Sequence, residues 1–275
     1  MKTLIRVGTT SYIKPADILP NVRYLGPLVD DIELVLFESE ELSNLPDEKT
    51  IDALSSLARE HDLTYTVHFP LDIYPGSRDE SVRVRAVEMM GRIVTLTEEL
   101  DPFGYVLHLT PDHYGPSPSD DVAGWLLSLD RSLAEFLTST GIDPSLVCAE
   151  TLSYPFSIVE PLVERYDLSV TLDIGHIWLM GYDADSAAGR LLPHARICHL
   201  HGVRDGKDHL GLDEGNSEAI ERFLGQLVAQ VDRDGKERAL TIEVFGEREF
   251  TASLSMLKRS RAMMNQMGGG IYGNH

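Results

Sequence analysis

The chain has 275 residues, of which 43% are hydrophobic and 25% are charged; this ordinary globular composition excludes disordered, collagen-like and coiled-coil proteins. It carries 24 Lys and Arg against 44 Asp and Glu, a formal net charge of −20. Such a field repels phosphate backbones, so we expect no nucleic-acid partner and no binding to an anionic membrane. Bound metal cations remain compatible with it.

The sequence predicts a cytoplasmic protein. It contains no run of 18 apolar residues that would cross a membrane, and its N-terminus lacks the apolar segment of a signal peptide. Its two cysteines, Cys148 and Cys198, lie in apolar runs typical of buried strands, so we expect inert thiols.

Eight short apolar runs rich in β-branched residues recur along the chain, as expected for parallel strands that are covered on both faces. These runs are Leu4–Thr9, Ile32–Phe37, Leu63–His68, Gly104–Leu109, Leu146–Glu150, Ser169–Ile174, Arg196–His201 and Ala239–Val244. Between them, apolar residues at helical spacing predict amphipathic helices, for example over 51–58, 122–136 and 220–231. The pattern over 17–28 is weaker because two prolines interrupt it.

Eight strands alternating with about eight helices predict an α/β protein with a single (β/α)8 barrel over residues 1–265. The Gly-rich residues 266–275 are predicted to be a flexible tail. A doubly wound open sheet is the alternative. No GxGxxG follows the first strand, and no GxxxxGK[ST] or GxSxG occurs, so the usual nucleotide-binding and nucleophile-elbow motifs are missing.

Six successive predicted strands finish in histidine or acidic residues. In a (β/α)8 barrel these strand ends converge on one mouth, where the chemistry occurs. The residues at the strand ends and in the loop after the seventh strand are His68, His108, Glu150, Asp173, His176, His199, His201, Asp205, Asp208, His209 and Glu243.

Charged side chains at such half-buried positions are costly unless they are paired or bind a metal. Taken singly, each has a structural explanation: a hydrogen-bonded barrel histidine, a salt-bridged glutamate, or an aspartate that caps a helix. Taken together, they predict a divalent metal site. Nitrogen and oxygen ligands without thiolate suit zinc, manganese, iron or cobalt better than calcium or magnesium.

The chain resembles the AP-endonuclease and xylose-isomerase-like TIM-barrel superfamily from the first strand to Glu243. The resemblance is strongest in Thr171-Leu172-Asp173-Ile174-Gly175-His176, Arg196-Ile197-Cys198-His199-Leu200-His201 and the strand ends at Glu150 and Glu243. It implies one to three divalent ions per chain, most simply zinc or manganese. The implied ligands are Glu150, Asp173, His201 and Glu243 for one ion; His68, His108 and a shared Glu150 for a second; and His176 and His209 for a third.

Two positions depart from the superfamily pattern. Lys207 stands where the third site has an aspartate, so Asp208 or Asp205 would have to substitute for it. His199 and His201 point to the same side of their strand, and we favour His201 as the ligand because it lies nearer the mouth. The run from His199 to Val203, with Asp208 and His209 downstream, is similar to the cobamide-remodelling phosphodiesterases.

The first hypothesis is a metal-dependent phosphodiesterase that acts on a small molecule, with Glu150 bridging two ions and Arg204 and Lys207 near the substrate anion. The alternative is a single-metal sugar or sugar-phosphate isomerase or epimerase, with Glu150 and Glu243 as a paired acid and base. A non-catalytic binding barrel is the third possibility. The number of histidines beyond the four-residue set favours hydrolysis.

Overall fold

Eight parallel strands form a closed barrel in the computed structural model, which describes residues 4–38, 43–111 and 119–267. Around the barrel the strands follow the order β1-β10-β7-β6-β5-β4-β3-β2. Their bounds are β1 Ile5–Thr10, β2 Asp31–Val35, β3 Thr64–His68, β4 Gly104–Leu107, β5 Val147–Glu150, β6 Ser169–Asp173, β7 Ala195–Leu200 and β10 Arg238–Ile242. The predicted (β/α)8 barrel is confirmed, and the pairing of β1 with β10 excludes an open sheet.

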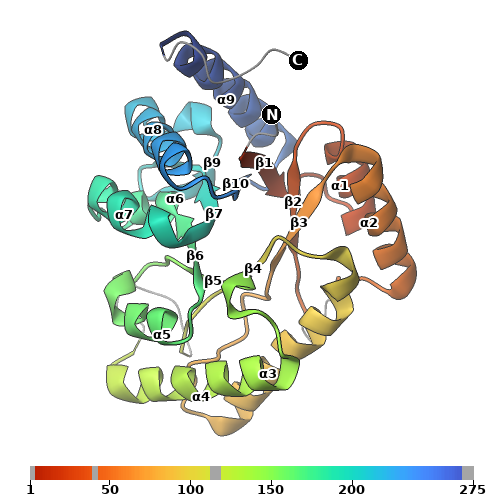
Figure 1. Ribbon diagram of the computed structural model, residues 1–275, viewed down its shortest axis with the longest axis vertical. Helices are drawn as coiled ribbons and strands as arrows, with labels where there is room; N and C mark the ends of the chain where they lie inside the picture. Colours follow the sequence, from red (N-terminus) through yellow and green to blue (C-terminus); the bar gives the residue numbers. More distant parts are fainter. Residues whose placement is uncertain (1–3, 39–42, 112–118, 268–275) are drawn as a thin grey trace.

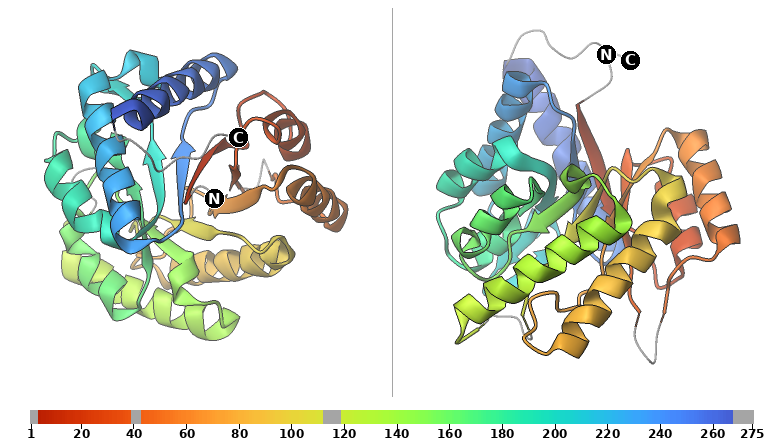
Figure 2. Two further views of the ribbon diagram at one scale, coloured as in Figure 1. Left: turned by 45° about the horizontal axis from the view of Figure 1, so that its top comes forward. Right: turned by 60° about the horizontal axis from the view of Figure 1, so that its bottom comes forward.

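Helices surround the strands (Figures 1 and 2). They are α1 Ile18–Leu25, α2 Glu48–His61, α3 Glu80–Thr97, α4 Val122–Thr140, α5 Glu160–Arg165, α6 Ile174–Leu179, α7 Ala184–Leu191, α8 Ser217–Asp234 and α9 Glu247–Met267. Pro20 lies in the first turn of α1, where a missing backbone N–H costs no helical hydrogen bond. Residues 268–275 of the predicted tail lie outside the described residues.

A hairpin that the sequence analysis did not predict follows β7. It consists of β8 (Gly202–Arg204) and β9 (Lys207–Leu210), which pair antiparallel. Asp205 and Gly206 form its turn with φ angles of 54° and 73°, the left-handed conformation that an Asp-Gly pair adopts readily. The hairpin carries the loop histidine, His209, back towards the barrel mouth.

The barrel interior changes from apolar to polar along the strands. A small cluster of Val106, Cys148, Ile197 and Ala239 fills the lower part. Because side chains alternate between faces, the residues two positions later also point inward; they are His108, Glu150, His199 and Thr241. The apolar cluster therefore forms a floor beneath the polar mouth. Burial raises the pKa of both cysteine thiols to about 12, and neither forms a disulfide.

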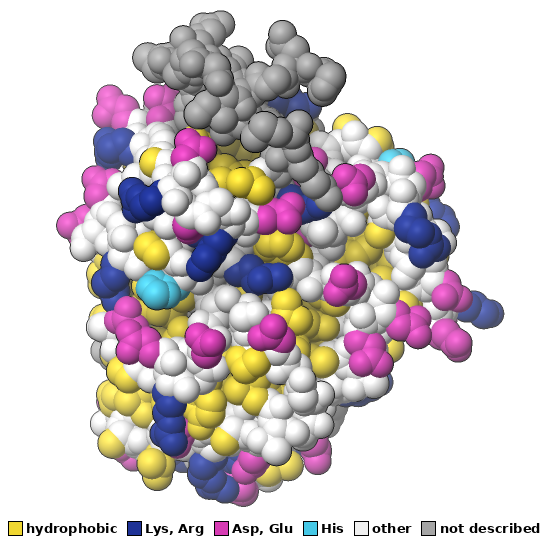
Figure 3. Space-filling view, in the orientation of Figure 1, with side chains coloured by type: hydrophobic (Ala, Val, Ile, Leu, Met, Phe, Trp, Pro, Cys, Tyr) yellow, Lys and Arg dark blue, Asp and Glu magenta, His cyan; other side chains and the backbone are white. Residues whose placement is uncertain are grey.

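The outer surface reflects the acidic composition. On the face drawn in Figure 3, Lys and Arg side chains are interspersed with Asp and Glu, and the described residues there form no continuous basic stripe. Of the helices in the described ranges, none combines the length and apolar character needed to cross a membrane.

Asp31 is a buried carboxyl at the opposite end of the barrel interior from the mouth, at the start of β2. Thr64 Oγ1 donates to its Oδ1 at 2.6 Å, and Thr66 Oγ1 donates to its Oδ2 at 2.9 Å. Burial raises the pKa of this carboxyl to about 7, against the opposing effect of the two threonine hydrogen bonds.

We predict that Asp31→Asn stabilises the protein more at pH 8 than at pH 5. Since the pKa is raised in the folded state, this group stabilises the fold least once the pH exceeds both its unfolded and its folded pKa. Between pH 5 and the folded pKa of about 7, at 1.36 kcal/mol per pKa unit, wild type should lose about 3 kcal/mol of unfolding free energy that Asp31→Asn keeps. Urea unfolding at both pH values measures this loss. An identical difference at pH 5 and pH 8 would contradict it.

Candidate metal centre

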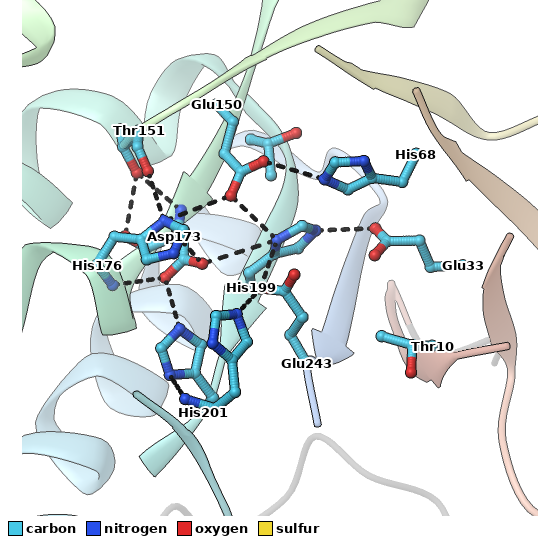
Figure 4. A network of polar contacts seen from close by, with 12 residues as sticks. Thr10, Glu33, His68, Glu150, Thr151, Asp173, His176, His199, His201 and Glu243 are labelled. Atoms are coloured by element: carbon cyan, nitrogen blue, oxygen red, sulfur yellow. Dashed lines mark hydrogen bonds and ion pairs between the residues drawn. The ribbon is translucent and has the colours of Figure 1, made fainter. Parts of the chain in front are cut away.

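The strand ends bring the predicted histidines and carboxylates together at the barrel mouth (Figure 4). His68, Glu150 and Asp173 are the last residues of β3, β5 and β6, and His108 and Glu243 directly follow β4 and β10. Three groups of side chains have ligand atoms close enough to share a metal ion. The groups are Glu150, Asp173, His199 and Glu243; His68, His108 and Glu150; and His176, His201 and His209.

The four-residue group surrounds the Nδ1 atom of His199. This nitrogen lies 3.1 Å from Glu243 Oε2, 3.5 Å from Glu150 Oε1 and 3.8 Å from Asp173 Oδ2. All four atoms are buried and have no hydrogen-bond partner. Buried polar atoms are normally satisfied, and a divalent cation would satisfy these four at once. The donor set therefore fits a metal with mixed nitrogen and oxygen ligands.

The structure places His199 in this group, in the place that the sequence analysis favoured for His201. Asp173 pairs in register with His199 on the neighbouring strand, so their side chains emerge at the same level. His201 emerges two residues later, about 7 Å further along the chain direction. Its Nε2 reaches Asp173 Oδ1 at 3.3 Å, and the structure groups it with His176 and His209.

Glu150 also belongs to the second group. Its Oε2 lies 2.7 Å from His108 Nε2 and 3.4 Å from His68 Nε2. His68 Nδ1 donates to the carbonyl oxygen of Phe69 at 2.6 Å, so Nε2 is the nitrogen that faces Glu150. The two oxygens of one carboxylate thus face two different groups of potential ligands, as expected for a bridging residue.

The third group contains histidines only. Asp208 lies beside His209, with its Oδ1 at 3.3 Å from His209 Nδ1, and Asp205 lies in the hairpin turn. Neither aspartate belongs to a ligand group within the described ranges. The structure therefore does not place Asp205 or Asp208 where either would replace the missing aspartate.

Imidazoles and carboxylates shift each other's ionisation at the mouth. Burial lowers the pKa of His199, but Glu33, Glu243 and Glu150 outweigh it and raise the pKa well above its usual value. Burial also opposes the shift at His68, where the Glu150 hydrogen bond raises the pKa to about 9. Burial raises the pKa of Glu150, but His108 and His199 lower it well below its usual value. The Glu150 carboxylate is thus ionised and attracts positive charge.

The two predicted substrate-binding residues lie on the hairpin. Arg204 is exposed and forms an ion pair with Glu214 Oε2 at 2.6 Å, and Lys207 is exposed at the start of β9. Neither residue belongs to any of the three ligand groups found among the described residues. Their role towards a substrate stays a prediction.

Glu33 is a buried residue of the site that sequence reasoning missed. It points inward from β2, and its Oε2 accepts a hydrogen bond from His199 Nε2 at 2.8 Å. This bond places the imidazole proton on Nε2 and leaves the Nδ1 lone pair facing the carboxylates, an arrangement typical of metal-binding histidines. The alternation Asp31-Ile32-Glu33-Leu34, with acids on the inner face of a barrel strand, was the available signal.

Comparisons with known proteins agree with this architecture. The family model described as "Xylose isomerase-like TIM barrel" matches residues 25–266. A D-tagatose 3-epimerase-like protein superposes with a TM-score of 0.75 at 22% identity, covering 95% of this chain and 99% of the other. Endonuclease IV from Thermus thermophilus superposes with a TM-score of 0.71 at 16% identity, covering 95% of this chain and 99% of the other. The 3-keto-D-glucoside 4-epimerase from E. coli superposes with a TM-score of 0.69 at 16% identity, covering 94% of this chain and 99% of the other. No curated protein sequence matches the chain.

We predict that Glu33→Gln weakens metal binding by about 10- to 100-fold, the usual effect of losing a carboxylate behind a ligand histidine. Isothermal titration with Zn²⁺ measures the affinity. Asp31→Asn is the matched control, because Asp31 is buried on the same strand but contacts Thr64 and Thr66 and no metal-ligand group. Equal zinc affinity in Glu33→Gln and wild type would contradict the positioning role.

Proposed function

Because the chain belongs to the xylose isomerase-like TIM barrel family, whose members include metal-dependent enzymes, we propose that it is a divalent-metal-dependent hydrolase of a small-molecule phosphodiester. The observation that carries this proposal is that the two carboxylate oxygens of Glu150 face different groups of ligands. Its Oε1 faces His199 Nδ1 at 3.5 Å, whereas its Oε2 faces His108 and His68. One carboxylate can therefore hold two ions side by side, the arrangement that supports displacement at phosphorus.

Two divalent ions in these groups, zinc or manganese, would supply Lewis acidity that lowers the pKa of a water nucleophile and stabilises charge on phosphodiester oxygens. The protein side chains would hold these ions and orient them towards the substrate. Glu150 and Glu243 are the carboxylates nearest the reacting atoms, with Asp173 and His199 completing one group and His68 and His108 the other.

His209 and His176 lie at the more open side of the site and face the substrate in this proposal. Their side chains are 25% and 16% exposed, whereas those of the four-residue group are at most 8% exposed. Burial lowers the pKa of His209, but the Glu243 carboxylate beside its Nε2 raises the value to about 9. A protonated His209 therefore places positive charge near the phosphodiester at neutral pH.

The finer proposal is that the substrate is a cobamide, cut at the phosphodiester of its nucleotide loop. The run His199-Leu200-His201-Gly202-Val203, which supports this likeness, forms the end of β7 and the start of the hairpin that carries His209. The net charge of −20 and the interspersed surface charges favour a small-molecule substrate over DNA.

One observation favours the isomerase or epimerase alternative. Glu150 and Glu243 both lie within 3.5 Å of His199 Nδ1, so a substrate bound by a single ion in this group would lie between two carboxylates. Such a pair could remove and return a proton at carbon. This alternative needs only the four-residue group and assigns no metal to His68 and His108.

Two assays on metal-loaded protein separate these functions. We expect hydrolysis of bis-(p-nitrophenyl) phosphate and, from a complete cobamide, release of a nucleoside with a phosphorylated corrinoid left behind. We expect no exchange of solvent deuterium into ketoses. Deuterium exchange without phosphodiester hydrolysis would overturn the hydrolase proposal, and hydrolysis of the model ester with an unchanged cobamide would overturn only the finer one.

We predict that Glu150→Ala lowers hydrolysis by about 1,000-fold or more while the fold persists. Loss of a bridging carboxylate affects both ion groups, and metal ions supply several kcal/mol of charge stabilisation, of which about 4 kcal/mol corresponds to this factor. His108→Ala is the control, since it removes a ligand from one group only. Metal analysis should show losses at two sites for Glu150→Ala and at one for His108→Ala. Full activity in Glu150→Ala would contradict the bridging role.

A further inference from the structure

We infer that His201 is a positioning residue and not a metal ligand, so that the mouth of the barrel holds two ions and not three. This inference rests on the metal-dependent function proposed above. It concerns the histidine-only group, in which His176, His201 and His209 have nitrogen atoms close enough to share an ion. Proximity alone makes this group resemble a third metal site.

The hydrogen bonds of His201 decide its tautomer. The backbone N–H of His209 donates to His201 Nδ1 at 3.0 Å, so Nδ1 accepts and carries no proton. The carbonyl oxygen of Gly202 lies 3.4 Å from the same nitrogen, beyond the usual N–H···O distance. A neutral imidazole has one N–H, which must then be on Nε2. Nε2 lies 3.3 Å from Asp173 Oδ1, a contact outside hydrogen-bond geometry.

A nitrogen that carries a proton has no lone pair for a metal ion. Binding an ion through Nε2 would therefore require an imidazolate or loss of the hydrogen bond from His209. The histidines with ligand character are arranged the opposite way. Nε2 of His199 donates to Glu33, and Nδ1 of His68 faces the Phe69 carbonyl oxygen. Each of these two directs its other nitrogen at a ligand group.

His201 instead joins Asp173 to the hairpin. Its ring is fully buried and stacks on the ring of His209, with centroids 4.3 Å apart and planes 15° apart. His209 has a φ of 51°, a conformation that costs a non-glycine residue about 1 kcal/mol or more, and the bond to His201 helps to hold it there. A side chain at Gly175 would overlap the His201 ring, so the glycine of the Asp-Ile-Gly-His run provides the space it occupies.

The first test counts zinc in protein saturated with Zn²⁺. We expect two ions per chain in wild type and in His201→Ala, with affinity about 10- to 100-fold weaker in the variant. His201→Gln should recover most of the affinity, because its amide nitrogen can donate to Asp173 from near the position of Nε2. His201→Asn is the matched control: its amide can accept from His209 N–H but does not reach Asp173. His199→Ala should lose one ion. A zinc count that falls in His201→Ala, or an affinity that does not change, overturns the inference.

The second test needs no variant. Long-range ¹H–¹⁵N NMR spectra of the zinc-loaded wild-type protein report which nitrogen of each histidine carries the proton. We expect a protonated Nε2 and an accepting Nδ1 for His201; an Nε2 without a proton overturns the inference. Neither test depends on turnover. Failure to hydrolyse bis-(p-nitrophenyl) phosphate would overturn the proposed hydrolase, while the zinc count and the tautomer would still decide the role of His201.

Discussion

The structure of the mouth depends on burying three carboxylates around one imidazole nitrogen. Glu150, Asp173 and Glu243 each direct an oxygen without a hydrogen-bond partner towards His199 Nδ1, in a site that water barely reaches. The carboxylates raise the pKa of His199, and the histidines in turn lower the pKa values of Glu150 and Glu243. A divalent cation replaces protons on the histidines and satisfies the same lone pairs.

The barrel makes this arrangement possible through the alternation of its strands. A compact apolar floor of Val106, Cys148, Ile197 and Ala239 lies inside the lower barrel, and the next inward positions of the same strands are polar. The charged residues are therefore fixed by strands that are hydrogen-bonded on both sides, rather than by mobile loops. Rigid support of this kind reduces the reorganisation needed when a metal or a transition state binds.

The sequence predicts the fold and the residue types of the site well, because both depend on local patterns. Apolar runs at regular spacing identify the eight strands, and the acidic or histidine residue at the end of six of them identifies the mouth. The choice between His199 and His201 depends instead on the register between β6 and β7, which pairs Asp173 with His199. No local pattern in the sequence of β7 predicts this register. Glu33 is hidden for a related reason, since its partner, His199, is 166 residues away along the chain.

The second nitrogen of each histidine explains why similar side chains in one cavity can have different roles. An acceptor behind the ring, such as the Glu33 carboxylate behind His199 or the carbonyl oxygen of Phe69 behind His68, takes the imidazole proton and turns the other nitrogen to the site. A donor behind the ring, such as the backbone N–H of His209 behind His201, forces the proton into the site. Ligand and positioning residue are thus separated by one hydrogen bond whose direction is set by the backbone, and counting histidines overestimates the number of ions a barrel of this kind can hold.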